Sequence, residues 1–349
     1  MAEVLVTGGS GYIGSWCVLA LLDAGHSVRT TVRSLSREAE LRAMLQRGGA
    51  APDAPLQVLT ADLTQDAGWQ EAVQGCDAVL HVASPTLTTA PRSDEEMVTP
   101  AREGVLRVLR ASRDAGVRRV VLTSAIGAIA YGHPDRDTPF TEDDWTNVDA
   151  GIEPYQKSKT LAERAAWDFI ATQGDGLELA TVNPTGVLGP VLGPDFSPSL
   201  GLIQHMLDGS MPLSLKFASG YVDVRDVADL HLRAMTDPAA AGQRFIATSG
   251  RSLWVREVAG ILRRRLGKRA DRVPTREMPV WAARTLSLVK PELRPLRALL
   301  GKDLDATSEK AQRLLNWQPR PVEDTIAETA ESLLALDAHL PADGVNKTG

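Results

Sequence analysis

A phenol and an ammonium group stand four residues apart at Tyr155 and Lys159, where a segment with helical periodicity begins. Positions i and i+4 lie on one face of a helix, so the two side chains are expected to be neighbours. An unperturbed phenol titrates near pH ~10, and an adjacent ammonium lowers that pKa and makes the phenol a usable proton donor. Helix surfaces often carry such a pair without a function, so its meaning depends on the motifs that precede it.

A glycine-rich turn near the N-terminus is the first of those motifs. Thr7-Gly8-Gly9-Ser10-Gly11-Tyr12-Ile13-Gly14 follows an apolar run that predicts a strand, and a helical pattern starts at Tyr12. Glycines at this spacing permit a tight turn, close approach of the backbone to a pyrophosphate and close packing of the helix on the sheet. The N-terminus of the helix then directs free N–H groups at the phosphates. We expect a dinucleotide to contact Gly8, Ser10, Gly11, Tyr12, Ile13 and Gly14.

The residues after the second predicted strand indicate which dinucleotide binds. Sites for NAD place an acid about twenty residues after the glycine turn to hold the ribose hydroxyls. Here the chain has Arg33, Ser34 and then Arg37, with no acid before Glu38. A guanidinium suits the 2′-phosphate of NADP(H), so Arg33 and Arg37 predict NADP(H) as the cofactor. Lys159 is expected to hold its nicotinamide ribose, and the other expected contacts are Asp62, Leu63, Val82, Ala83, Ser84, Thr123, Tyr155, Pro184 and Val187.

Alternating short apolar runs and helical patterns must position these groups. Near-continuous apolar strands separated by helices predict an α/β fold with a doubly wound parallel sheet, the Rossmann arrangement. We expect residues 1–182 to form the dinucleotide-binding domain, with 216–236 returning to it. Residues 183–215 and 237–339 carry scattered helical patterns and a Gly/Pro-rich loop, which predict a smaller, mainly helical C-terminal substrate lobe. Residues 340–349 are expected to be a disordered tail.

Composition excludes several classes of function. The chain has 349 residues, 43% of them hydrophobic and 23% charged, a balance typical of soluble globular proteins. A net charge of −6 gives no field that would attract nucleic acid or an anionic membrane. The six histidines show no ligand spacing, so we expect no metal site. Two cysteines, Cys17 and Cys76, and the lack of a signal-like leader or an uncharged span favour a cytoplasmic protein.

Taken together, these motifs resemble the extended short-chain dehydrogenases/reductases of the NAD-dependent epimerase/dehydratase superfamily. Within it the chain is similar to the dihydroflavonol-4-reductase-like branch, which includes microbial aldehyde and methylglyoxal reductases. The matching stretches are 7–16, 31–33, 61–63, 81–85, 119–124, 155–167, 183–190 and 221–228. The resemblance implies an NADP-dependent oxidoreductase that passes a hydride to a carbonyl carbon while Tyr155 protonates the oxygen.

The chain departs from the family at one catalytic position. Members carry a Ser-Ser pair after the fifth strand, and the second serine hydrogen-bonds the substrate oxygen, whereas this chain has Ser124-Ala125. A shift of one residue along a strand turns a side chain to the opposite face. Losing a donor to a developing oxyanion costs on the order of 3 kcal/mol in other enzymes. Ser124 is carried as a catalytic candidate on the condition that the strand end brings it to the site.

The substrate is expected to be small and largely apolar. No Lys or Arg occurs between Arg164 and Lys216, a stretch that includes the Gly/Pro-rich loop. A nucleotide-sugar would need cations for its diphosphate, so this lack disfavours it. The candidate substrate contacts are Thr86, Ile126, Tyr131, Leu188 and Leu192.

Other functions and either assembly state stay open on the sequence. One alternative is an NAD-dependent sugar-nucleotide epimerase or 3-beta-hydroxysteroid-type dehydrogenase, which cofactor preference would distinguish. Another is a non-catalytic NADP-sensing regulator, which would not need Tyr155 and Lys159. The chain is expected to be a monomer or a homodimer.

Overall fold

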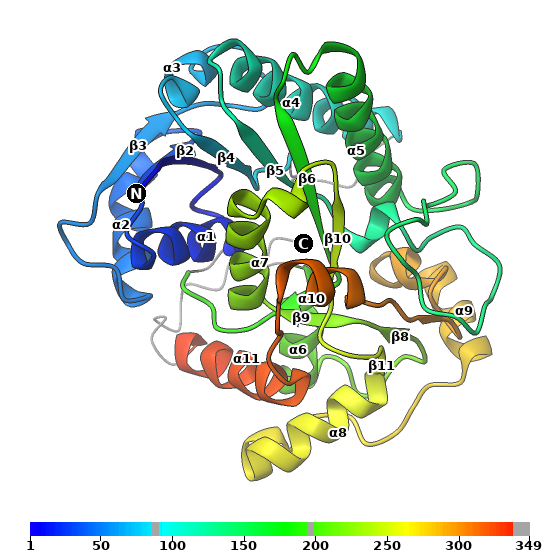
Figure 1. The fold of residues 1–349 in the computed structure, drawn as a ribbon. Helices are drawn as coiled ribbons and strands as arrows, with labels where there is room; N and C mark the ends of the chain where they lie inside the picture. The colour runs from blue at the N-terminus through cyan, green and yellow to red at the C-terminus, as the bar shows by residue number, and fades with distance from the viewer. Residues whose placement is uncertain (86–90, 92, 194–197, 338–349) are drawn as a thin grey trace.

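A seven-stranded parallel sheet forms the centre of the larger lobe (Figure 1). The computed structural model describes residues 1–85, 91, 93–193 and 198–337. The strands lie in the order β10-β6-β5-β4-β1-β2-β3, so the direction of winding reverses between β1 and β4. Ligands bind outside the carboxyl ends of the strands at such a switch point. The strands are β1 (Glu3–Thr7), β2 (Ser27–Val32), β3 (Leu56–Thr60), β4 (Ala78–His81), β5 (Arg119–Thr123), β6 (Glu178–Pro184) and β10 (Arg244–Ala247).

Helices cover both faces of this sheet, as the apolar strands require. One face packs against α1 (Tyr12–Asp23), α2 (Glu38–Arg47) and α7 (Val224–Thr236), with Cys17, Leu41 and Val227 fully buried there. The other face packs against α3 (Trp69–Val73), α4 (Glu95–Asp114) and α5 (Pro154–Gln173), with Val108 and Ala166 buried there. Burial of strands on both faces confirms the predicted doubly wound α/β fold.

A second lobe lies beside the carboxyl ends of the strands and has its own core, which includes Ile203, Val258 and Ile326. It contains more strand than expected, in a two-stranded and a three-stranded sheet. The strands are β7 (Gly186–Leu188), β8 (Ala218–Ser219), β9 (Tyr221–Asp223), β11 (Leu253–Trp254) and β12 (Asp303–Leu304). The helices are α6 (Pro198–Asp208), α8 (Val255–Leu266), α9 (Val280–Val289) and α11 (Val322–Asp337). Across the whole chain, the short 3₁₀ turns are η1 (Leu35–Arg37), η2 (Ile126–Ala128), η3 (Pro238–Ala240), η4 (Gly267–Ala270) and η5 (Pro291–Leu296).

The boundary expected for the C-terminal lobe is wrong in one respect. Residues 237–339 were assigned to that lobe, but β10 pairs with β6 and so extends the central sheet. The helix α10 (Glu309–Leu315) and Trp317 also pack in the core of the larger lobe. A strand of four residues is too short to show a period, which explains why the sequence did not reveal it. The expected tail at 340–349 lies outside the described residues.

No helix in the described part of the chain is both long enough and apolar enough to cross a bilayer.

Candidate functional site

The glycine turn forms a cradle that side chains would fill. Gly8 has a φ of 69°, in the left-handed region that favours glycine. A Cβ placed on Gly14 would lie 2.2 Å from the carbonyl oxygen of Gly8, and one placed on Gly8 would lie 3.0 Å from Cβ of Ala83. Helix α1 begins at Tyr12 without a side-chain cap, because its N-cap residue is Gly11. The first N–H groups of α1 therefore remain suitable for phosphate, and the cradle fits a dinucleotide.

Thr30 on β2 supports this cradle from below, which the sequence analysis missed. Its hydroxyl donates to the carbonyl of Val6 (2.8 Å) and accepts from the N–H of Gly9 (3.1 Å). A Cβ on Gly9 would lie only 2.1 Å from the Thr30 Oγ1, so glycine is required there. The second glycine of the Gly8-Gly9 pair was the signal for this contact.

Cations gather where the adenosine end of a dinucleotide would lie. Arg37 donates to the Ser10 hydroxyl (3.4 Å) and pairs with Glu40 (3.1 Å). Arg33 is exposed at the end of β2 and makes no hydrogen bond with a described residue. Hydrogen bonds from Thr64, and then the charge of Arg33, hold the pKa of the Asp62 carboxyl below its usual range. The structure thus places Arg33 near Asp62 and Arg37 beside the cradle, as a 2′-phosphate site requires.

Tyr155 and Lys159 lie on the first turns of α5, next to the end of β5. The Tyr155 side chain is 47% exposed, and its ring lies beside Gly127, whose added Cβ would be 3.7 Å from Tyr155 Cε1. The Lys159 ammonium donates to the carbonyl of Thr123 (3.5 Å). Both groups therefore stand at the carboxyl edge of the sheet where the cofactor site opens.

The electrostatics of this pair differ from the expectation. Although the residue as a whole is 47% exposed, burial around its titrating hydroxyl, and then the neighbouring Tyr131, raise the pKa of Tyr155 above its ordinary value of 10.0. Burial lowers the pKa of Lys159 to about 8, although the Glu163 carboxylate opposes that shift. The prediction that Lys159 lowers the pKa of Tyr155 is therefore wrong for the protein alone, because the ammonium is directed at Thr123. Tyr155 stays a protonated phenol, which is the form that donates a proton.

Ser124 is directed away from the catalytic pair, into a buried polar cluster. Its hydroxyl donates to Glu163 Oε2 (2.5 Å), which also accepts from Asn183 Nδ2 (2.8 Å). The other carboxylate oxygen pairs with Arg244 Nε (2.7 Å). The candidate role of Ser124 as a donor to the substrate is therefore corrected, since its only proton is already committed. The Thr123 hydroxyl bonds His231 Nε2 (2.7 Å), although the residue also lines a small cavity beside Lys159.

The cluster around Glu163 was not found from the sequence. Glu163 is 0% exposed, and Arg244 stacks over the ring of Trp145 with 3.7 Å between its Cζ and the ring centroid. Asn183 on the otherwise apolar β6 and Glu163 four residues after Lys159 were the available signals. Charged residues in helices usually face solvent, so these signals were weak.

The other expected cofactor contacts lie around the same edge. Ala83 donates its N–H to the Thr7 hydroxyl (3.0 Å), which also bonds His81 Nδ1 (2.8 Å). A small cavity of about 20 Å³ brings several of the expected residues together, namely Leu63, Ala83, Ser84, Ser124 and Lys159. Val82 directly follows β4. Tyr12 donates to the carbonyl of Gly189 (2.9 Å) and so links the cradle to the second lobe. Pro184 and Val187 are buried at the end of β6 and in β7.

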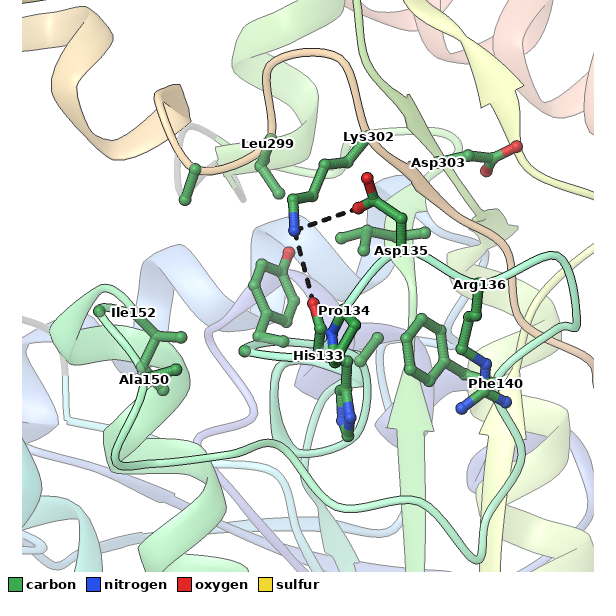
Figure 2. A pocket seen from close by; sticks show the side chains of 16 residues that line it. His133, Pro134, Asp135, Arg136, Phe140, Ala150, Ile152, Leu299, Lys302 and Asp303 are labelled. Atoms are coloured by element: carbon green, nitrogen blue, oxygen red, sulfur yellow. Dashed lines mark hydrogen bonds and ion pairs between the residues drawn. The ribbon is translucent and has the colours of Figure 1, made fainter.

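The expected substrate residues separate into two groups. Tyr131 lines a cavity of about 250 Å³ together with His133, Ile152 and Lys302 (Figure 2). The Lys302 ammonium donates to the carbonyl of His133 (3.5 Å) and pairs with Asp135 (3.4 Å) on one side of this cavity.

Leu188 and Leu192, by contrast, are 0% and 8% exposed and pack in hydrophobic cores, which leaves them little surface for a ligand. Ile126 is partly buried beside a small cluster that includes Ile129. Thr86 lies outside the described residues.

Comparisons with known proteins place the chain in one family and find reductases among its relatives. The model of the "NAD dependent epimerase/dehydratase family" matches residues 4–247. The chain is 33% identical to a cinnamoyl-CoA reductase of Medicago truncatula over 336 residues, covering 95% of each protein. It is 33% identical to a dihydroflavonol 4-reductase of Zea mays, covering 84% of this chain and 80% of that protein.

Solved structures give the same result. The yeast methylglyoxal/isovaleraldehyde reductase Gre2, crystallised with NADPH, aligns with a TM-score of 0.77 at 26% identity and covers 97% of this chain and 100% of its own. Within the described residues there is no cluster of three or more His, Cys, Asp or Glu that could hold a metal ion.

Proposed function

The chain belongs to the NAD dependent epimerase/dehydratase family, and we propose that it is an NADPH-dependent reductase of small ketones or aldehydes with Tyr155 as proton donor. The observation that carries this proposal is the position of Tyr155 and Lys159 beside the end of β5, at the sheet edge where the Gly8–Gly14 cradle opens. A cofactor with its phosphates in that cradle runs along the edge that holds the catalytic pair.

When bound, NADPH supplies the hydride that forms the new C–H bond on the carbonyl carbon. The Tyr155 phenol then gives its proton to the carbonyl oxygen, so that the product is a neutral alcohol and the residue is left as a phenolate. The Lys159 ammonium stabilises that phenolate and passes on a proton from solvent to restore it. The raised pKa of Tyr155 keeps the phenol protonated until the hydride has been transferred and the oxygen has become basic.

A second donor to the carbonyl oxygen must replace the family serine. Ala125 has no hydroxyl, and the Ser124 hydroxyl is committed to Glu163. Tyr131 is close enough to Tyr155 to raise its pKa, and burial raises the pKa of Tyr131 as well. We therefore assign the second hydrogen bond to the Tyr131 hydroxyl, which stays protonated and lines the substrate cavity.

Arg33 and Arg37 account for a preference for NADPH over NADH. Arg33 directly follows β2 and Arg37 ends the 3₁₀ turn η1, and the chain has no acid at the end of β2, where an NAD site holds ribose hydroxyls. Arg33 is free of hydrogen bonds to described residues, so its planar guanidinium can bind a 2′-phosphate in the bidentate manner.

The proposal is tested by following cofactor oxidation with purified protein and a panel of aliphatic and aryl aldehydes, ketones and ketoesters. We expect kcat/KM with NADPH to exceed that with NADH by at least about tenfold, which corresponds to ~1.4 kcal/mol. Equal use of NADH, or cofactor retained as NAD on purification, would instead favour an epimerase or a steroid-type dehydrogenase. Cofactor binding without turnover on any carbonyl compound would favour a sensor.

A further inference from the structure

Three arginines outside the site already described line one wall of an open hollow. Arg284 lies on α9, Arg294 in η5 and Arg297 directly after it, and all three are exposed. The hollow has a volume of about 670 Å³. Its opposite wall contains Gly151 and Glu153, immediately before the helix that begins with Pro154 and Tyr155.

These arginines differ from other arginines of the same lobe in having no ion pair with a described side chain. Arg284 and Arg294 donate only to the main-chain carbonyls of Leu300 (3.4 Å) and Leu288 (3.5 Å). Among the described side chains, no carboxylate pairs with Arg284, Arg294 or Arg297. By contrast, Arg264 and Arg265 on α8 and Arg269 in η4 are paired with Glu323, Asp324 and Glu331 at 3.2, 2.7 and 3.1 Å. Among the described side chains, therefore, positive charge is concentrated on this wall without an ion-pair partner.

The hollow is joined to the candidate substrate cavity. Gly151 and Ala298 line both, so the two cavities adjoin. Tyr131 and Ile152 stand in the first cavity, and Ile152 is three residues before Tyr155. The two adjoining cavities thus lie between residues 151–153, which directly precede the catalytic helix, and the three arginines.

We propose that the carbonyl substrate carries an anionic group, a carboxylate or a phosphate, that Arg284, Arg294 and Arg297 bind while the carbonyl group lies at Tyr155. Guanidinium groups bind both anions with paired, charge-assisted hydrogen bonds. This inference rests on the proposed reductase function and adds the substrate class. It also explains why the lack of cations between Arg164 and Lys216 does not make the whole site apolar, since these arginines come from a later segment.

Glu153 provides a second test of the proposal, because it contributes a carboxylate to the same hollow. Burial, and then Asp94, raise the pKa of Glu153, so the surroundings already disfavour its charge. An anion bound to the arginine wall would face this carboxylate. Replacing Glu153 by glutamine therefore has the opposite expected effect to replacing an arginine: it lowers KM for anionic substrates and leaves neutral substrates unchanged.

The experiment compares matched substrates with NADPH as cofactor. One series pairs straight-chain aldehydes with the corresponding ω-oxo carboxylates, and a second pairs ω-hydroxy aldehydes with their phosphate esters, each over a range of chain lengths. We expect kcat/KM for the anionic member to exceed that of its neutral partner by roughly tenfold at the length that spans the two adjoining cavities, and this advantage to shrink with added salt. The series that shows the advantage identifies carboxylate or phosphate as the group.

One triple variant and a matched control test whether the three arginines cause that advantage. Arg284→Gln, Arg294→Gln and Arg297→Gln, combined in one protein, are expected to remove the advantage while the neutral aldehydes are reduced as before. Arg269→Gln removes a positive charge from an exposed ion pair elsewhere in the lobe and should preserve it. An unchanged preference in the triple variant, or no preference at any length in the unaltered protein, overturns the anionic substrate. Reduction of the neutral aldehydes in the same assays shows whether the reductase function itself stands.

Discussion

Helix α5 carries Tyr155 in its first turn and Glu163 two turns later, and the surroundings of these two side chains are opposite. The Tyr155 hydroxyl makes no hydrogen bond with any described residue, and its side chain is 47% exposed. Glu163 is fully buried and accepts hydrogen bonds from Ser124, Asn183, Arg244 and Thr181. One part of the helix therefore offers a group to a ligand, while the other fixes the helix to β5, β6 and β10.

The contrast predicts that substitutions at Tyr155 and at Glu163 have different effects on the free energy of unfolding. A buried charge that loses its partner is expensive, whereas an exposed phenol with no partner contributes little to folding. Substitutions at the first site should therefore change rate and not stability, and those at the second should change stability first.

Tyr155→Phe should have the largest effect. Loss of the proton donor is expected to lower kcat for reduction by on the order of 10³-fold, the usual range for a positioned acid. Steady-state NADPH oxidation measures the rate, and quenching of protein fluorescence by NADPH measures binding. Binding and the thermal midpoint should stay close to those of the unaltered protein. Near-normal turnover would contradict the role of Tyr155, and a large loss of stability would contradict the contrast.

Glu163→Gln should be the most damaging to folding. It leaves the Arg244 guanidinium buried without its counter-charge, at an expected cost of about 3 kcal/mol in the free energy of unfolding. Urea denaturation followed by circular dichroism measures this cost. Glu331→Gln is the matched control, because it breaks the exposed pair with Arg269 and should cost roughly 0.5 kcal/mol or less. Equal losses in the two variants would show that the buried cluster does not fix α5.

The same contrast explains which parts of the site could be predicted from the sequence. The cradle was predictable because each of its parts is local: Gly8, Gly11 and Gly14 stand in one turn between a strand and a helix. Tyr155 and Lys159 were predictable because a helix fixes i and i+4 neighbours. The fold followed from apolar strands and helices that alternate over the first half of the chain.

What the sequence could not supply depends on contacts between distant segments. The carboxylate of Glu163 meets Arg244, which is 81 residues away, and nothing in a helical pattern marks such a residue as buried. The sequence did not indicate whether the Ser124 side chain points toward the catalytic pair. In the structure its hydroxyl donates to the Glu163 carboxylate. The pKa of Tyr155 likewise depends on Tyr131 and on burial, neither of which spacing on one helix reports.

The pH dependence of the rate should follow Lys159 and not Tyr155. The pKa of Lys159 is lowered to about 8, and that of Tyr155 is raised above 10.0, so Lys159 loses its charge first as the pH rises. We expect kcat for reduction to be constant below pH 8 and to fall above it by up to about tenfold per pH unit. Lys159→Arg keeps the charge and should move the fall to higher pH. Lys157→Arg, at the exposed pair with Asp94, should not move it. A profile that Lys159→Arg leaves unchanged would contradict this assignment.

Ala125→Ser should have the smallest effect. It tests whether the site near the first turn of α5 already has a second hydrogen-bond donor for the carbonyl oxygen. A hydroxyl at position 125 adds the donor that the family places there, and Tyr131 is the group proposed to act in its stead. If Tyr131 already bonds the carbonyl oxygen, the new serine adds a second donor and raises kcat by up to about tenfold, less than the 10²-fold that a sole donor provides. Tyr131→Phe should then lower kcat in the unaltered protein by more than it does in the Ala125→Ser variant, because the two hydroxyls substitute for each other. Steady-state rates of the unaltered protein, the two single variants and the double variant measure how strongly the two substitutions depend on each other. Additive effects would mean that the two positions act on different atoms, and Tyr131 would lose its proposed role while Tyr155 kept its own.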